Sequence, residues 1–392
     1  MEPEQEVQPL IVPPVATTPV KKTFAQHLKN PKVIAGIVAG LVVIAALTSV
    51  ALAYRKQAGK STGCEGNSCN TNEAIVSATP TPTPSATPTP VARKLDGAMV
   101  EPGQENIRPL GIMIENHPEA RPQAGLAEAD WVYEAIAEGG ITRFLALYAD
   151  ANTKDVRVGP VRSVRTYYLD YAREYNAFLA HVGGNSDALA SIQANGGITD
   201  LDQFAIGEPT FKRDFSRNVS TEHTMFSSTG KLWDHITSKK YEQAGGYEPL
   251  LFTDEAPEAS RGAAQNVSID FSSASFGVKW AFDPKTNTYA RAMAGLAHKD
   301  ADTGEVITTK NIVLQTVQSV QVTSSGGKVV GKFTLTGSGK VIVLNNGIAT
   351  VGTWKRSGNE RTRYYNADGS EMKLVRGNTW VEVVHPDTVI SY

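Results

Sequence analysis

The pattern of hydrophobic and polar positions predicts a membrane helix near the start of the chain. Residues 33–53 (VIAGIVAGLVVIAALTSVALA) carry no charged side chain. At about 1.5 Å per residue, a helix of this length spans about 31 Å, close to the thickness of a bilayer's hydrocarbon core. No small-residue cleavage site directly follows the apolar run, so we expect the helix to be retained as an anchor. Residues 1–32, rich in proline, glutamate and glutamine, are expected to form a disordered cytoplasmic tail.

A linker separates this helix from the rest of the chain. Residues 54–94 contain the Thr-Pro repeat SATPTPTPSATPTPV (77–91), which predicts an extended, semi-rigid spacer. Similar numbers of basic residues flank the apolar segment on both sides, so the positive-inside rule leaves its orientation open. Spacers of this kind commonly hold a domain away from a membrane. We therefore expect a single-pass cell-membrane protein whose C-terminal domains are extracytoplasmic. Its interaction with the membrane would be through helix 33–53.

Residues 95–240 alternate between strand and helix patterns. Apolar runs of strand length lie at 110–115, 131–137, 143–149 and 177–182. Helix patterns lie at 164–175, 187–194 and 229–239. Alternation of this kind predicts an N-terminal mixed α/β layer domain.

The helix pattern ends near residue 267, and short strand patterns replace it. Turn residues such as Gly326-Gly327 and Asn345-Asn346-Gly347 separate these runs. Their regular spacing is typical of a compact antiparallel sandwich or open barrel, so residues 267–392 are expected to form a mainly antiparallel β C-terminal domain. Residues 241–266 would connect the two domains. The expected fold class is α+β, preceded by one transmembrane helix.

Charge and cysteine content exclude several classes of protein. The chain has 38 basic and 40 acidic residues and a net charge of −2, so no overall basic field would attract nucleic acid and no nucleic-acid partner is expected. The two cysteines, Cys64 and Cys69, exclude a disulfide scaffold and an all-cysteine metal site. They lie outside both folded regions, which excludes a cysteine nucleophile there, and they could pair with each other or between chains. Nucleotide-binding glycine motifs are absent, and no cofactor is expected.

Two polar loops that follow strands of the first folded region form the main candidate site. In an open sheet, ligands bind beyond the carboxyl ends of the strands, and two adjacent parallel strands would place both loops in one cleft. The alternative is that Glu115 and Asn116 cap a turn and that His181 is an ordinary core histidine. The candidate ligand-binding residues of these loops, together with one histidine from a third loop, are Asn116, His117, Arg121, Gly183, Gly184 and His223.

The segment GPVRSVR (159–165) is a candidate anion site. Ser163 is a plausible N-cap for the helix that follows, and Arg162 lies beside the positive end of that helix. Backbone N–H groups and a guanidinium together bind phosphate or carboxylate, and Arg143 and Arg165 would contribute. The alternative is an arginine network that ties this loop to nearby glutamates for stability.

Acid–base groups in the same region would permit catalysis. Glu115, Glu138 and His181 are the candidate catalytic residues, because paired carboxylates with different pKa values cleave glycosidic bonds. A serine hydrolase is not indicated, since no Gly-x-Ser-x-Gly motif is present. His117, His181 and His223 include no i,i+4 pair, and no metal site is predicted.

Several longer segments resemble a known family. ENHPEARPQAGL (115–126), ADWVYEAIAEGGITRF (129–144), GPVRSVR (159–165) and HVGG (181–184) are similar to the first domain of the YerB-like lipoproteins. YARAMAGLAHKDADTGE (289–305), NIVLQ (311–315), GSGK (337–340) and TWVEVV (379–384) resemble their C-terminal domain. The resemblance implies a two-domain extracytoplasmic bacterial protein, held at the membrane, in a family of undefined activity. The chain departs from the family where a retained apolar helix replaces the lipid-modified cysteine and where Glu222-His223-Thr224 replaces Pro-His-Asn.

Two functions are compatible with these residues. The first is a membrane-anchored extracytoplasmic protein that binds a cell-wall polymer or an envelope protein through a polar cleft of arginine, histidine and glutamate residues. The alternative is a hydrolase that acts on cell-wall glycans and uses Glu115 or Glu138 with a histidine. The absence of a known catalytic motif favours the first function.

Overall fold

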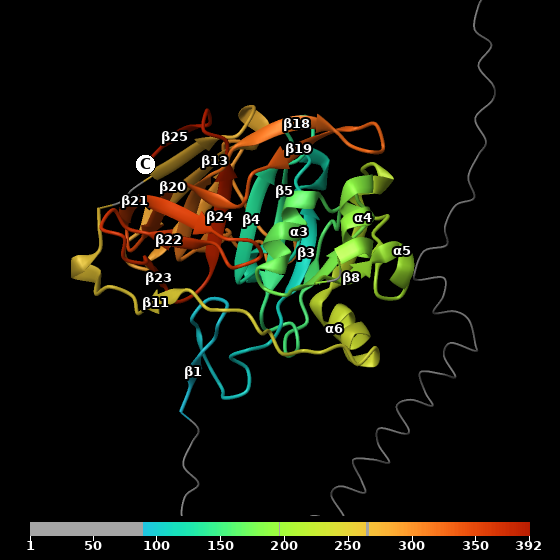
Figure 1. Cartoon of the computed structure of the whole chain (residues 1–392), viewed down its shortest axis with the longest axis horizontal. Helices are drawn as coiled ribbons and strands as arrows, with labels where there is room; N and C mark the ends of the chain where they lie inside the picture. The colour runs from blue at the N-terminus through green and yellow to red at the C-terminus, as the bar shows by residue number, and fades with distance from the viewer. Residues whose placement is uncertain (1–88, 196, 264–265) are drawn as a thin grey trace, which may run out of the picture. The chain divides into compact units, whose positions relative to one another are not determined.

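The computed structural model describes residues 89–195, 197–263 and 266–392 (Figure 1). The predicted tail 1–32, the predicted transmembrane helix 33–53 and most of the linker 54–94, with both cysteines, lie outside these residues. Within the described ranges, no helix is both long enough and apolar enough to cross a membrane. The longest α-helices in these ranges have 10 residues. The single-pass anchor therefore has no support in the described part of the chain.

One ten-stranded sheet contains strands from both halves of the chain. In spatial order the strands are β22 (Arg363–Tyr365), β21 (Ile348–Arg356), β20 (Gly337–Asn345), β17 (Asn311–Thr316), β24 (Thr379–Val384), β4 (Trp131–Ile136), β5 (Thr142–Tyr148), β3 (Leu110–Glu115), β7 (Phe178–His181) and β8 (Thr199–Asp202). At its centre β24 and β4 pair in parallel, with Trp380 opposite Val132. The first five strands come from the C-terminal half, and the other five come from the N-terminal half.

The expected fold class, with an α/β N-terminal domain beside a separate antiparallel domain, is wrong. Over the described residues as a whole, far more residues lie in strands than in helices, and the same sheet continues from one half into the other. The physical reason lies in the central strands β4 and β24, which are buried almost throughout. A buried strand needs a neighbour at each edge to pair its backbone N–H and C=O groups, and each half supplies that neighbour to the other.

Helices cover both faces of the N-terminal half of this sheet. Alternate residues of β3 point to opposite faces, so that Met113 joins one hydrophobic cluster and Ile112 and Ile114 join the other. α3 (Thr166–Arg173) packs on the Met113 face, where Tyr171 stacks on Tyr133 with ring centroids 4.1 Å apart. α6 (Thr229–Ser238) packs on the other face through Leu232, Trp233 and Ile236. The remaining α-helices in the described residues are α4 (Ser186–Asn195) and α5 (Gln203–Ile206).

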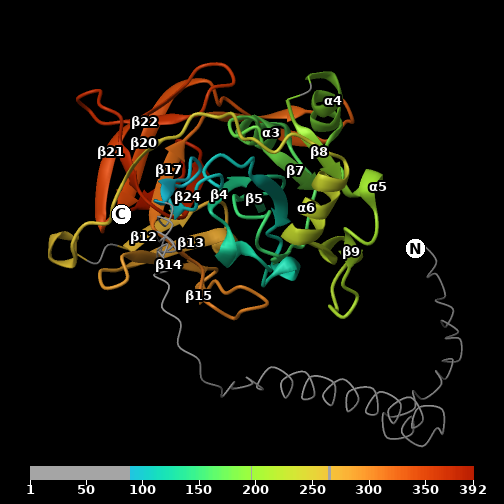
Figure 2. The ribbon, with the colours of Figure 1, turned by 90° about the horizontal axis from the view of Figure 1, so that it is seen from below.

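A second, six-stranded sheet packs against the ten-stranded sheet (Figure 2). Its strands are β15 (Leu296–Ala297), β14 (Thr288–Met293), β13 (Gly277–Asp283), β12 (Asn266–Asp270) and β25 (Val389–Ser391), with β16 (Thr308–Thr309) also paired to β14. Buried and more exposed positions alternate along β13, which places Trp280 on its inner face. Trp280 meets Trp380 of β24 edge to face, with ring centroids 5.3 Å apart. Aromatic packing therefore joins the two sheets.

Short elements complete the described structure. The remaining strands are β1 (Val91–Ala92), β2 (Met99–Val100), β6 (Arg157–Val158), β9 (Lys212–Arg213), β10 (Met225–Ser228), β11 (Leu251–Thr253), β18 (Ser319–Thr323), β19 (Val329–Phe333) and β23 (Lys373–Val375). The one-turn 3-10 helices are η1 (Pro118–Ala120), η2 (Leu126–Glu128), η3 (Thr221–His223), η4 (Glu258–Ser260) and η5 (Ala274–Phe276). η1 follows β3, and η3 lies between the paired strands β9 and β10, so both reach the candidate site.

Candidate functional site

The ends of β3 and β7 bring two predicted loops together. The two strands are neighbours and run in parallel, with Ile112 opposite Ala180. Their carboxyl ends therefore meet at one edge of the ten-stranded sheet, where ligands bind in open sheets. A cleft of about 780 Å³ lies at this edge. Four of the predicted residues line it, namely Arg162, Ser163, Gly183 and Gly184.

Most of the other residues that line the cleft were not among the predicted site residues. Asp202 ends β8, and Phe204 lies in α5 with 75% of its surface exposed. Arg213 comes from β9, and Glu222 comes from η3. Whether Phe204 is exposed and whether Arg213 has an acidic partner depend on the fold. The sequence therefore carried no signal for these two residues.

The Gly183-Gly184 loop passes close to two neighbours. Gly183 has a φ of +58°, which favours glycine, and a Cβ atom there would lie 3.1 Å from the Phe204 ring. A Cβ atom on Gly184 would lie 2.9 Å from Cγ1 of Val164. The two glycines therefore let this wall of the cleft pack against both Phe204 and the segment before α3.

His181 fixes this loop and does not line the cleft. The side chain is fully buried, with Nδ1 2.9 Å from the Gly183 carbonyl oxygen and Nε2 2.8 Å from Asp200 Oδ1. Asp202 Oδ1 accepts hydrogen bonds from the N–H groups of Gly183 at 2.9 Å and Phe204 at 3.3 Å. The interpretation of His181 as a satisfied core histidine matches these contacts.

Glu115 and Arg162 form the polar floor beside the cleft. Arg162 Nε donates to Glu115 Oε2 at 2.5 Å, and Arg143 Nη2 lies 3.7 Å from the same oxygen. Burial raises the pKa of Glu115, but the charges of Arg143 and Arg162 outweigh it and leave the pKa below its ordinary value. Glu115 is therefore a carboxylate at neutral pH, which suits charge stabilisation and not proton donation.

Arg165 and Glu138 pair with each other at the start of α3. Arg165 Nη2 donates to Glu138 Oε2 at 2.8 Å, and Arg165 Nε contacts the other oxygen. Burial opposes ionisation, but this contact with Arg165 lowers the pKa of Glu138 overall. Ser163 is not the N-cap of α3, because Arg165 holds that position and the Ser163 hydroxyl donates to the Val182 carbonyl at 2.9 Å. Arg165 and Glu138 thus form an arginine–glutamate contact of the kind considered above as the alternative to an anion site.

Asn116 and Arg121 belong to a buried network on the far side of the β3 loop. Asn116 Oδ1 accepts from Arg121 Nε at 3.0 Å and from Gln123 Nε2 at 2.9 Å. Asn116 Nδ2 donates to the Thr142 hydroxyl at 2.6 Å, and this hydroxyl donates to Glu134 Oε1 at 2.6 Å. The structure thus places Asn116 and Arg121 outside the cleft lining.

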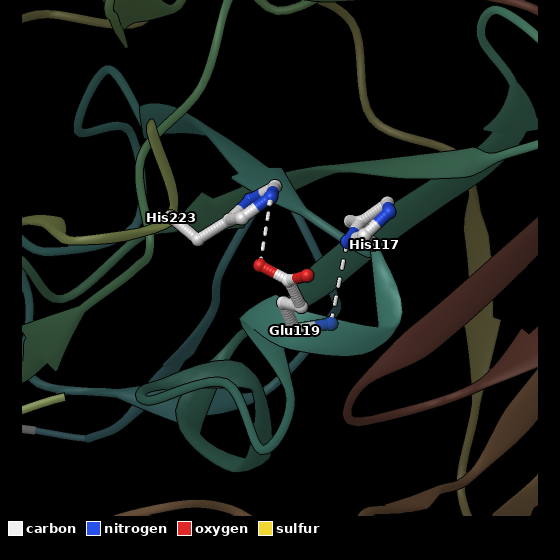
Figure 3. Close-up of side chains that lie close together, drawn as sticks. All are labelled: His117, Glu119 and His223. Atoms are coloured by element: carbon white, nitrogen blue, oxygen red, sulfur yellow. Dashed lines mark hydrogen bonds and ion pairs between the residues drawn. The ribbon is translucent and has the colours of Figure 1, made fainter. Parts of the chain in front are cut away.

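The two remaining predicted residues, His117 and His223, lie together (Figure 3). Their rings stack with centroids 4.6 Å apart and planes inclined by 6°. Glu119, which sequence reasoning missed, lies beside them, and its Oε2 is 3.9 Å from His223 Nε2. Its position two residues after His117 was the available signal. Burial lowers the pKa of His223, and His117 and Arg162 add to this effect while Glu115 and Glu222 oppose it.

Comparisons with known proteins agree with the resemblance seen in the sequence. The N-terminal domain of the family described as "Protein of unknown function (DUF3048)" matches residues 95–242, and its C-terminal domain matches residues 267–381. YerB of Bacillus subtilis, which its name classes as a lipoprotein, is 29% identical over 298 residues, covering 75% of this chain and 86% of YerB. The crystal structure of YerB matches with a TM-score of 0.67 and 27% identity, over 77% of this chain and all of that chain. The chain therefore belongs to the YerB-like, two-domain DUF3048 family.

Proposed function

We propose that the protein binds an acidic glycan of the cell wall in the cleft at the ends of β3 and β7. The observation that carries the proposal is Arg213, which lines the cleft. Its Nη1 donates to the Thr221 carbonyl at 2.5 Å, and among the described residues it has no carboxylate oxygen within 4.0 Å. A guanidinium without an acidic partner favours a carboxylate or phosphate from a ligand.

Arg162 supplies a second guanidinium to the same cleft. About a quarter of its side chain is exposed, and its Nη2 lies 3.4 Å from Glu222 Oε2. The Glu222 side chain is itself 57% exposed, so this contact is a weak surface pair. The acid group of a ligand could therefore replace Glu222 as the partner of Arg162.

Phe204 and the acidic residues of the cleft favour a sugar over a bare anion. The exposed Phe204 ring offers an apolar surface to the ring of a sugar, in the way that aromatic side chains contact ligands with one apolar face. The carboxylates of Asp202 and Glu222 would accept hydrogen bonds from hydroxyl groups. Guanidinium, carboxylate and aromatic groups together match a glycan that carries acid groups.

We extend a membrane-attached, extracytoplasmic position to this chain from the lipoprotein designation of YerB. Such a position would bring the cleft within reach of the cell wall. Protease added to intact, wall-stripped cells should then remove the folded part of the protein. Resistance to protease until the cells are lysed would contradict this location.

Arg213→Ala should weaken the binding of soluble peptidoglycan fragments by the full-length protein at least about tenfold. A hydrogen bond to a charged group contributes about 1.5–3 kcal/mol, and about 1.4 kcal/mol corresponds to a tenfold change in affinity. Isothermal titration calorimetry measures the effect. Lys212→Ala is the matched control, because Lys212 is the neighbouring residue of β9, is exposed and does not line the cleft. Arg162→Ala should weaken binding as well.

Two results would contradict the proposal. If Arg213→Ala binds the fragments as tightly as the unchanged protein, the cleft is not the binding site. If the unchanged protein binds an envelope protein but no wall fragment, the ligand is a protein and not a glycan.

A further inference from the structure

We propose that His117, Glu119 and His223 bind a divalent transition-metal ion beside the cleft. Each residue offers one ligand atom, and the three atoms lie within 4.8 Å of one another. His117 and Glu119 come from the loop and the one-turn helix after β3, whereas His223 comes from η3, far later in the chain. Figure 3 shows the Glu119 side chain directed toward His223. The fold thus brings together a donor set that neither segment contains alone.

The chemistry of this donor set fits zinc and related ions. Two imidazoles and one carboxylate bind Zn²⁺ with a fourth position left open, and the same groups bind other divalent first-row metals. His223 is the buried member, with only 3% of its surface exposed. Its Nε2 is the nitrogen that faces the carboxylates, 3.9 Å from Glu119 Oε2 and 3.5 Å from Glu222 Oε1, and it is therefore the atom placed to bind the ion. A neutral histidine binds a metal through one ring nitrogen.

Both histidines can reach one ion only after a small rearrangement. An imidazole binds a metal in the plane of its own ring, whereas the two rings are stacked nearly parallel. His117 is the ring that can turn, because it is only partly buried and its Nδ1 accepts a single long hydrogen bond, from the Glu119 N–H at 3.3 Å. Two ligand atoms on one zinc ion lie at most about 4.2 Å apart. The three ligand atoms already lie within 4.8 Å of one another, so they need to move only slightly closer.

Glu222 links the proposed metal site to the cleft. Its Oε1 lies 3.5 Å from His223 Nε2, and its Oε2 lies 3.4 Å from Arg162 Nη2. An ion held by His223 would attract this carboxylate and loosen its contact with Arg162. Zinc should therefore strengthen the binding of an acidic glycan, a consequence that rests on the function proposed above.

Isothermal titration of the chelator-treated, full-length protein with Zn²⁺, in the absence of glycan, tests the site. Cys64 and Cys69 are replaced by serine in every protein compared, because thiolates bind zinc. We expect one zinc ion per chain and a loss of affinity of at least about tenfold in His117→Ala and in Glu119→Gln. Both changes are at residues that are at least partly exposed, so the variants should fold. Co²⁺ provides a second measurement, since its visible absorption reports nitrogen coordination and should weaken in His117→Ala.

His235→Ala is the matched control, because His235 lies on α6 and is not part of the group. It should bind zinc as the unchanged protein does. Absence of zinc binding by the unchanged protein, or equal binding by His117→Ala and Glu119→Gln, would overturn the metal site. That result leaves glycan binding untouched, because the titration contains no glycan. Zinc binding that leaves the affinity for wall fragments unchanged would overturn only the coupling through Glu222.

Discussion

Replacement of Arg291 by methionine should lower the free energy of unfolding by about 3–5 kcal/mol, the usual effect of removing one partner from a buried ion pair. Arg291 lies on β14 with 1% of its surface exposed, and its guanidinium contacts Glu134 of β4. Its Nη1 donates to His298 Nδ1 at 2.7 Å, and its guanidinium carbon lies 4.5 Å from the centre of the Trp380 ring. Methionine would fill much of the volume but leave the Glu134 carboxylate buried between the two sheets without its charged partner.

Urea denaturation followed by fluorescence measures this loss. Lys154→Met is the matched control, because Lys154 pairs with Glu128 at the surface, where both side chains are partly exposed. A surface pair contributes at most about 1 kcal/mol, so the control should unfold almost as the unchanged protein does. Similar losses in the two variants would mean that the Arg291–Glu134 contact does not hold the sheets together.

Individual strands could be predicted from the sequence, but their partners could not. The apolar run at 110–115 is β3, and the run at 131–137 is β4 with one residue fewer. The segment TWVEVV (379–384) is β24, yet nothing in it indicates parallel pairing with β4. Apolar runs report burial, whereas pairing depends on neighbours that are distant in the chain. The fold class was wrong for this reason.

Part of the candidate site could be predicted because it depends on strand ends. The loops after β3 and β7 were expected to share a cleft if their strands were parallel neighbours. The two strands are parallel neighbours, but only the loop after β7 lines the cleft, through Gly183 and Gly184. Asn116 shows the limit of this reasoning. A polar residue after a buried strand is equally consistent with a ligand site and with a buried network, and here it contacts Gln123 and Thr142 in such a network. Only the three-dimensional contacts distinguish the two.

The buried network also explains how the C-terminal half fixes the loop that carries His117. Asn116 precedes His117 and is held by Gln123, whose Oε1 lies 2.9 Å from His298 Nε2. His298 in turn contacts Arg291, which contacts Glu134. Polar groups in a buried network are satisfied by one another, so the loop after β3 is positioned by residues from both halves of the chain.

Glu382 is a second buried carboxyl group at this contact between the sheets. It lies on β24 with none of its surface exposed, and Trp280 Nε1 donates to its Oε1 at 2.8 Å. Burial and the neighbouring Glu134 carboxylate raise the pKa of Glu382 well above its ordinary value, although Arg291 and the hydrogen bond from Trp280 oppose the shift. The folded protein therefore keeps a proton that the unfolded chain releases above about pH 4.5. The stability linked to this proton is complete below that pH and is lost as the pH rises toward the folded-state pKa.

Glu382→Gln should remove this part of the pH dependence. The amide has no acidic proton to lose and keeps an oxygen that can accept from Trp280. Relative to the unchanged protein, the variant should gain free energy of unfolding as the pH rises from about 5 to about 8, by up to about 1.4 kcal/mol per pH unit. Urea denaturation at several pH values measures the difference between the two proteins, in which the contributions of other titrating groups cancel. A difference that stays constant over this range would show that the pKa of Glu382 is not raised, and the two buried carboxyl groups would then have to be ionised together beside Arg291.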